Sequence, residues 1–135
     1  MISTRGRYAL RVMIDLAEHG RRGYVPLKEI AERQGISKKY LEIIVKELVN
    51  GGLVAGISGR SGGYRLCREP GEYSVWEILE LTEGSMAAVG CLEKDAGTCP
   101  RAADCRTLPM WEEYDALIRD FFRSKKLTEL ARTEQ

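Results

Sequence analysis

Residues 27–67, LKEIAERQGISKKYLEIIVKELVNGGLVAGISGRSGGYRLC, decide the fold of this chain. The first part, 27–34, has apolar residues on one helical face. Pro26 precedes it, as is favoured at a helix start, and Gly35 ends it. Ser37 can cap the next helix, whose apolar stripe consists of Leu41, Ile44, Val45 and Leu48. Two helices joined by so short a turn predict a helix-turn-helix.

A β-hairpin is predicted directly after the second of these helices. Two short runs, Leu53–Ser58 and Tyr64–Cys67, flank the glycine-rich turn 59–63, and this pattern is typical of a hairpin. A helix is also predicted near the N-terminus, with Ser3 or Thr4 as its cap, from the three- and four-residue spacing of Tyr8, Ala9, Val12, Met13, Leu16 and Ala17. Three helices followed by a hairpin predict a winged helix. The fold class is mainly α with a small β-hairpin wing.

The rest of the chain predicts two further helices and an irregular segment between them. SVWEILELTEG, residues 74–84, has helical spacing, with Val75, Ile78, Leu79 and Thr82 facing inward. MWEEYDALIRDFFRSKKLTELA, 110–131, predicts one long helix. We divide the chain into a winged helix-turn-helix domain at 1–68, a linker with a supporting helix at 69–84, a cysteine loop at 85–109, and a dimerisation helix with a tail at 110–135.

Composition and charge narrow the class of function. The chain has 135 residues, of which 44% are hydrophobic, and a formal net charge of +1. Residues 1–65 contain 12 Lys and Arg against 6 Asp and Glu, whereas residues 66–135 contain 9 against 14. The N-terminal half therefore favours a polyanionic partner, and the C-terminal half does not.

Several classes of protein are disfavoured by what the sequence lacks. No stretch approaches the roughly 18 apolar residues of a membrane span, and the first residues have no uninterrupted apolar run typical of a secretory signal. We therefore expect a cytoplasmic protein without a membrane partner. The sequence contains no P-loop, HExxH motif or Ser-His-Asp set, so we expect that it is not an enzyme.

The outer face of the second helix of the helix-turn-helix is predicted to contact DNA. Its lysines can neutralise phosphates, and Glu42 can accept a hydrogen bond from a cytosine amino group. An ion pair of Glu42 with Lys38 or Lys46 is the alternative. In the wing, glycines allow close approach to a DNA backbone, and Arg60 can enter a minor groove. The predicted DNA-binding residues are Ser37, Lys38, Lys39, Tyr40, Glu42, Lys46, Arg60, Ser61, Gly62 and Gly63.

Cys91, Cys99 and Cys105 are candidate metal ligands. Thiols gathered in one cytosolic loop favour a metal site, because disulfides are rare in that compartment. Structural zinc is disfavoured because the loop has no CxxC pair, whereas an iron-sulfur cluster could be held by three thiolates and one further ligand. A redox-active thiol pair and three inert thiols are the alternatives. Cys67, on the predicted wing strand, is more typical of a small buried hydrophobe.

The last predicted helix has more aromatic surface than one domain can cover. Trp111, Tyr114, Phe121 and Phe122 lie on it, while the three helices and the wing already close a core. The same helix of a second copy would supply a partner surface, so we expect a two-fold dimer.

The chain resembles the Rrf2 family of bacterial winged helix-turn-helix transcription regulators. The resemblance rests on ISTRGRYA at 2–9, on Ile36-Ser37 and Tyr40-Leu41-Glu42, on GGLV at 51–54, and on GGY at 62–64. It continues through the cysteine loop and the long helix. It implies a homodimer, a repressor or dual regulator, that binds double-stranded DNA at a pseudo-palindromic operator, with recognition helices in the major grooves and wings in the minor grooves.

The resemblance also implies an iron-sulfur cluster, 2Fe-2S or 4Fe-4S, held by Cys91, Cys99 and Cys105, whose state alters DNA binding. An aerobically purified sample can lack this cluster. Leu108 stands where many cluster-binding relatives have histidine, and Arg5-Gly6-Arg7 stands where some have an acidic ligand. The fourth ligand therefore stays open between Glu93, Asp95, Asp104, Glu112, an external thiol and water.

Two further points remain open at the level of sequence. Relatives often have Arg-Gly at the positions of Ser58-Gly59, whereas here the arginine comes two residues later, at Arg60. The alternative function is a winged-helix regulator or adaptor without metal, controlled by thiol oxidation or by a partner protein.

Overall fold

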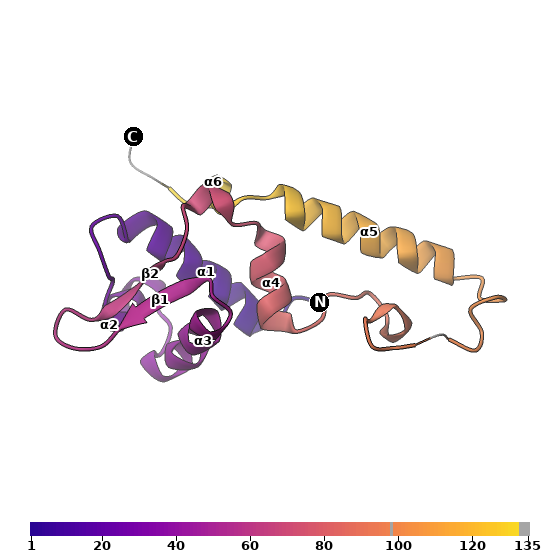
Figure 1. Ribbon diagram of the computed structural model, residues 1–135, viewed down its shortest axis with the longest axis horizontal. Helices are drawn as coiled ribbons and strands as arrows, with labels where there is room; N and C mark the ends of the chain where they lie inside the picture. Colours follow the sequence, from indigo (N-terminus) through magenta and orange to yellow (C-terminus); the bar gives the residue numbers. More distant parts are fainter. Residues whose placement is uncertain (98, 133–135) are drawn as a thin grey trace.

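The computed structural model describes residues 1–97 and 99–132 of the chain. Thr98, in the predicted cysteine loop, and residues 133–135, in the predicted tail, lie outside the described residues. The elements in chain order are α1 (Thr4–His19), α2 (Leu27–Gln34), α3 (Lys38–Asn50), β1 (Val54–Ile57), β2 (Gly63–Leu66), the short 3-10 helix η1 (Pro70–Glu72), α4 (Val75–Glu83), the 3-10 helix η2 (Gly90–Leu92), α5 (Leu108–Ser124) and α6 (Leu127–Leu130). The predicted class, mainly α with a β-hairpin wing, is confirmed (Figure 1).

The helix-turn-helix forms at the predicted residues. Gly35 follows α2 with a φ of 64°, a left-handed conformation that glycine adopts without a Cβ penalty. The hydroxyl of Ser37 accepts a hydrogen bond from the backbone N–H of Tyr40 at 3.2 Å and so caps α3. Local chemistry therefore determines both ends of the turn.

An ion pair between a buried carboxylate and a partly exposed arginine holds α2 against α1. The Asp15 side chain is fully buried and accepts hydrogen bonds from Arg33 Nε at 3.0 Å, Arg33 Nη2 at 2.8 Å and Gln34 Nε2 at 2.9 Å. The bonds to Asp15 raise the pKa of Arg33. Such a fork fixes the angle between the helices as well as their distance. The start of α3 is thereby positioned relative to α1.

The wing is a two-stranded antiparallel hairpin with Val54 opposite Leu66 and Ile57 opposite Gly63. It is anchored to the α1–α2 connection, because Val25 and Tyr64 exchange two backbone hydrogen bonds of 2.8 and 2.9 Å. A Cβ on Gly63 would lie 2.4 Å from the carbonyl oxygen of Val25. A glycine is therefore required at position 63, because any side chain would clash with the Val25 backbone.

The core lies between α1, α2, α3, the wing base and α4. The predicted apolar stripe of α3 is buried, and so are the predicted inward residues of α4, Val75, Ile78, Leu79 and Thr82. The N-terminal end of α1 is fixed to the C-terminal end of α4, because Glu83 accepts hydrogen bonds from the backbone N–H and hydroxyl of Ser3 at 2.9 and 2.7 Å.

Tyr73 is a fully buried polar junction. Its hydroxyl donates to the Leu53 carbonyl at 2.6 Å and accepts from the backbone N–H groups of Cys67 and Arg68 at 2.9 and 3.0 Å. Its own carbonyl accepts from the N–H of Leu127 at 3.0 Å. One residue thus connects the base of the wing to the C-terminal segment.

The prediction of one continuous helix over 110–131 is wrong. The chain becomes extended at Lys125, whose carbonyl accepts from the N–H of Val75 at 2.8 Å, and α6 follows with Leu127 fully buried. Burying the Leu127 side chain in the core stabilises the protein more than extending α5 by further turns would. Figure 1 shows α5 leading from the cysteine loop back to the winged helix, where α6 packs.

Within the described residues, no helix is long and apolar enough to cross a membrane.

The expectation that Cys67 is buried is also wrong. Cys67 is exposed, because it lies beyond the end of β2, where the chain leaves the hairpin. Its backbone N–H, not its side chain, contacts the buried Tyr73 hydroxyl.

We expect Tyr73→Phe to lower the free energy of unfolding by about 1–3 kcal/mol, because it leaves buried backbone groups without their partner. Burial raises the pKa of Tyr73 above its ordinary value of 10.0. The Tyr73 hydroxyl therefore loses its proton at a lower pH in the unfolded state than in the folded state. As the pH rises above about 10, the free energy of unfolding of the parent falls for this reason. The Phe variant has no hydroxyl at this position and lacks this pH-dependent loss. Urea unfolding at pH 7 and pH 10.5 measures both effects. Tyr24→Phe is the control, since its hydroxyl has no hydrogen bond within the described residues. Equal stability of the Tyr73 variant and parent at pH 7 would contradict the assignment.

Candidate functional site

The outer face of α3 carries the charged residues of the predicted DNA-binding set. Lys38, Lys39, Glu42 and Lys46 are all exposed. Tyr40 is half-buried, and its ring packs edge-on against that of Tyr8, with centroids 5.7 Å apart. Ser37 caps the helix through its hydroxyl. Ser37 and Tyr40 therefore have structural partners, whereas the charged residues project into solvent.

A groove separates α3 from the wing, and Glu42 lies on its wall. The groove is lined by Glu42, Lys46, Val49, Gly56, Ile57, Ser58 and Tyr64. Within the described residues, no ion pair joins Glu42 to Lys38 or Lys46, so the alternative interpretation of Glu42 is not supported. A free carboxylate beside lysines can accept a hydrogen bond from a ligand at this edge of the helix.

The wing residues divide into two kinds. Arg60 and Ser61 are exposed at the hairpin tip. Gly62 and Gly63 are required by the backbone itself, because a Cβ on Gly62 would lie 2.6 Å from the Ile57 carbonyl oxygen, and Gly63 approaches Val25 as described above. The two glycines therefore have a structural role that does not depend on any ligand.

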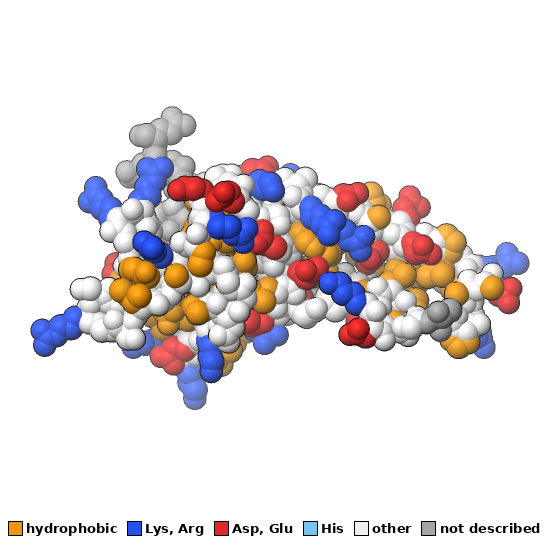
Figure 2. All heavy atoms as spheres, in the orientation of Figure 1, with side chains coloured by type: hydrophobic (Ala, Val, Ile, Leu, Met, Phe, Trp, Pro, Cys, Tyr) orange, Lys and Arg blue, Asp and Glu red, His pale blue; other side chains and the backbone are white. Residues whose placement is uncertain are grey.

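Two apolar residues on this surface do not belong to the predicted set. Ile43 on α3 is 55% exposed, and Ile57 on β1 is 48% exposed. The signal in the sequence was an isoleucine outside the buried stripe of α3, on the same face as Lys39 and Glu42. Figure 2 shows Lys and Arg side chains projecting around the winged-helix end of the molecule. The surface offers both cations and apolar contacts.

The three cysteines of the predicted metal site lie in the loop that joins α4 to α5. Cys91 is exposed in η2, and Cys99 and Cys105 are half-buried. Among residues 1–97 and 99–132, no group of three or more His, Cys, Asp and Glu side chains lies close enough to hold a metal ion. The loop brings the thiols to one end of the molecule but does not preassemble a ligand set in a single chain.

The donor chemistry of the loop nevertheless suits a thiolate site. The Thr107 hydroxyl lies 3.5 Å from Cys105 Sγ. This contact, together with the backbone N–H groups of Thr107 and Leu108, lowers the pKa of the Cys105 thiol. A thiolate is the form that binds iron or zinc and the form that is oxidised. These contacts favour the thiolate form of Cys105.

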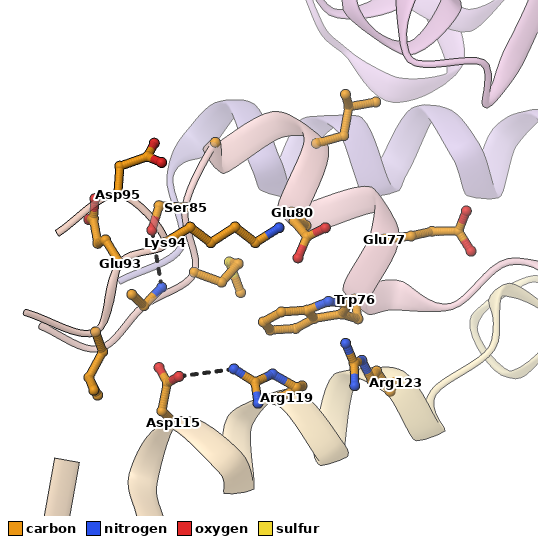
Figure 3. A pocket seen from close by; sticks show the side chains of 15 residues that line it. Trp76, Glu77, Glu80, Ser85, Glu93, Lys94, Asp95, Asp115, Arg119 and Arg123 are labelled. Atoms are coloured by element: carbon orange, nitrogen blue, oxygen red, sulfur yellow. Dashed lines mark hydrogen bonds and ion pairs between the residues drawn. The ribbon is translucent and has the colours of Figure 1, made fainter. Parts of the chain in front are cut away.

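A cavity of about 800 Å³ lies between α4, α5 and the cysteine loop. The guanidinium carbons of Arg119 and Arg123 lie 5.9 and 5.6 Å from the centre of a Trp76 ring. Figure 3 shows both arginines beside the indole of Trp76, and Asp115 joined to Arg119. This polar contact region connects α5 to α4 next to the loop.

A row of apolar side chains on α5 is left uncovered. Met110, Tyr114, Leu117 and Phe121 are 52%, 50%, 63% and 54% exposed. Their spacing of three and four residues places them on one face of the helix. No residue of α5 is fully buried, so packing against α4 alone does not cover this helix.

Comparisons with known proteins identify relatives over the whole fold. Residues 2–133 match the family described as "Rrf2: Iron-dependent Transcriptional regulator". The HTH-type transcriptional regulator IscR of Xenorhabdus nematophila is 37% identical over 134 residues, which are 99% of this chain and 80% of the relative. IscR of Aliivibrio salmonicida is 38% identical over 129 residues, 96% of this chain and 76% of the relative.

Solved structures agree in fold. The global cysteine regulator CymR of B. subtilis superposes with a TM-score of 0.78 at 35% identity, over 97% of this chain and 95% of that chain. IscR of T. potens superposes with a TM-score of 0.74 at 35% identity, over 96% of this chain and 85% of that chain. These relatives are transcriptional regulators and not enzymes, as the sequence predicts. The chain belongs to the Rrf2 family of winged-helix, DNA-binding transcriptional regulators.

Proposed function

We propose that the chain acts in the cytoplasm as a dimeric repressor or dual regulator, with α3 in the major groove of DNA and the wing tip at the adjacent minor groove. The observation that carries the proposal is the outer face of α3, where Lys38, Lys39, Glu42 and Lys46 are exposed. Of these four residues, Glu42 and Lys46 line the groove beside the wing. Buried contacts fix both elements on the same core, so a recognition helix and wing are presented together.

Each part of this surface has a different task in the proposal. The lysines neutralise phosphates and set the affinity, which carries no sequence information. Glu42 accepts from a cytosine amino group, and Ile43 supplies an apolar contact of the kind that a thymine methyl group favours. Arg60 and Ser61 lie at the wing tip, where an arginine suits a narrow minor groove. Gly62 and Gly63 let the backbone of the wing fold tightly, because a side chain at either position would clash with neighbouring backbone atoms.

We expect Lys39→Ala, and likewise Lys38→Ala, to weaken binding to all DNA sequences and to reduce the slope of log affinity against log salt by about 0.9, one phosphate contact. Glu42→Gln should instead leave the slope unchanged and relax the preference at one base pair by about 1–3 kcal/mol. Fluorescence anisotropy on a set of operator variants at several salt concentrations measures both. An unchanged slope in both lysine variants would contradict this docking.

We further propose that Cys91, Cys99 and Cys105 hold an iron-sulfur cluster whose presence or oxidation state alters DNA binding. The support is the donor set of three thiols in one loop, the lowered pKa of Cys105, and the kinship with IscR proteins and a family described as iron-dependent. The cluster would supply an iron centre that responds to redox state. Cys91, Cys99 and Cys105 would hold it through their thiolates.

Thiol oxidation without metal is the second candidate for the same loop. One support is the lowered pKa of Cys105. The other is the likeness to CymR of Staphylococcus aureus, which was solved in an oxidized form. That structure superposes with a TM-score of 0.73 at 33% identity, over 100% of this chain and 98% of that chain. Both candidates use the same thiols but differ in metal content.

We expect the anaerobically purified protein to contain iron and sulfide in matched amounts and to absorb visible light, and Cys99→Ala to lose both. Iron, sulfide and zinc analysis with an absorption spectrum measures this. Cys67→Ala is the control, because Cys67 lies outside the loop and should leave the iron content unchanged. A colourless anaerobic protein without metal, with a disulfide after mild oxidation, would favour the second candidate instead.

The uncovered face of α5 supports the dimer. We expect Leu117→Glu to shift the protein from dimer to monomer in sedimentation equilibrium, because it places a charge in the middle of the apolar row. Ala116→Glu adds the same charge at an exposed neighbouring position off the row and should leave the dimer intact. A parent protein that is monomeric at tens of micromolar would contradict the proposal.

A further inference from the structure

Asp115 on α5 makes a hydrogen bond that reaches back across the cysteine loop. Its Oδ1 accepts from the backbone N–H of Ala88 at 2.9 Å, a contact between residues 27 positions apart. Within the described part of the chain, no other hydrogen bond joins residues 85–104 to an element outside the loop. Among the described residues, this bond is therefore the one directional contact that ties residues 85–104 to a neighbouring helix.

The same carboxylate is also fixed from its other side. Asp115 Oδ2 accepts from Arg119 at 3.2 Å, and the Asp115 side chain is only 14% exposed. A carboxylate so far removed from water needs partners on both oxygens, and it gains them from the loop and from Arg119. The hydrogen bond to Ala88 is consequently charge-assisted, which is stronger than a bond between neutral groups.

Asp115 is further connected to the winged helix. Arg119 lies over Trp76 of α4 together with Arg123 (Figure 3). Helix α4 packs on α1, and Glu83 at its end holds the start of α1 through Ser3. Ala88 is therefore joined, through Asp115, Arg119 and Trp76, to packed elements that include α1, against which the recognition helix α3 also packs.

We propose that Asp115 is a positioning residue that holds the N-terminal arm of the cysteine loop, residues 85–91, against α5 and so sets where Cys91 lies. The inference deepens the proposed cluster function and rests on it for its regulatory meaning. Asp115 itself is not proposed as a ligand. Its effect on the cluster acts through the Ala88 backbone, three residues before Cys91.

The first test uses the metal-free full-length protein, so that it does not depend on a cluster. Hydrogen exchange of the Ala88 amide is followed by NMR in the parent, Asp115→Ala and Asp115→Asn. We expect Asp115→Ala to speed exchange at Ala88 by about 10- to 100-fold, as the loss of a charge-assisted bond implies. Asp115→Asn keeps an oxygen acceptor but loses the charge, so its increase should be less than about tenfold.

Asp120→Ala is the matched control. Asp120 is an exposed aspartate on the same helix, with no hydrogen bond or ion pair among the described residues, and it should leave exchange at Ala88 unchanged. The amides of Ile78 and Leu79 in α4 serve as an internal reference for global unfolding. Faster exchange at Ala88 alone, with partial rescue by Asn, supports positioning. Equal exchange in the parent and Asp115→Ala overturns it.

The second test follows loss of iron to a chelator after anaerobic reconstitution. We expect Asp115→Ala to lose iron about tenfold faster than the parent or Asp120→Ala, in the range found for residues that support metal ligands. Equal rates of loss would overturn the effect on Cys91. If the parent binds no iron, the cluster function fails, while the exchange experiment still decides whether Asp115 holds the loop.

Discussion

The hydroxyl of Tyr73 is the interaction on which the arrangement of the whole molecule depends. Buried and triply hydrogen-bonded, it closes the base of the wing by joining Leu53 to Cys67 and Arg68. The carbonyl of the same residue holds Leu127 of the returning C-terminal segment. Because a buried polar group without partners is costly, the wing base and the C-terminal segment are fixed together. The wing that we propose at the minor groove is thus attached to the segment that carries the cysteine loop and α5.

This attachment bears on how a signal from the loop could reach DNA. The cysteine loop lies at the far end of α5, away from the wing (Figure 1). Two routes lead back to the winged helix. One follows α5 to α6 and Tyr73, and the other passes from Asp115 and Arg119 through Trp76 to α4 and α1. Both routes consist of packed elements, through which a discrete rearrangement can be transmitted.

The sequence was sufficient for elements whose ends are set by local chemistry. The bounds of α2 and α3 follow from Pro26, Gly35 and Ser37, and the buried faces of α3 and α4 follow from apolar spacing. The sequence was insufficient where contacts with residues far away in the chain determine the local structure. The break at Lys125 could not be predicted, because 110–131 is helical in its local pattern and only the pocket for Leu127 interrupts it. Cys67 was placed wrongly for a similar reason, since its exposure depends on where the chain leaves β2.

The sequence by itself determined the winged helix, the family, and which residue types the candidate sites contain, because spacing and caps act over a few residues. Only the tertiary structure decided that Glu42 faces a groove shared with the wing, that Gly63 is required by Val25, and that Asp115 holds Ala88. These relations join residues far apart in the chain. They arise from the packing of whole elements, which no local pattern of residues specifies.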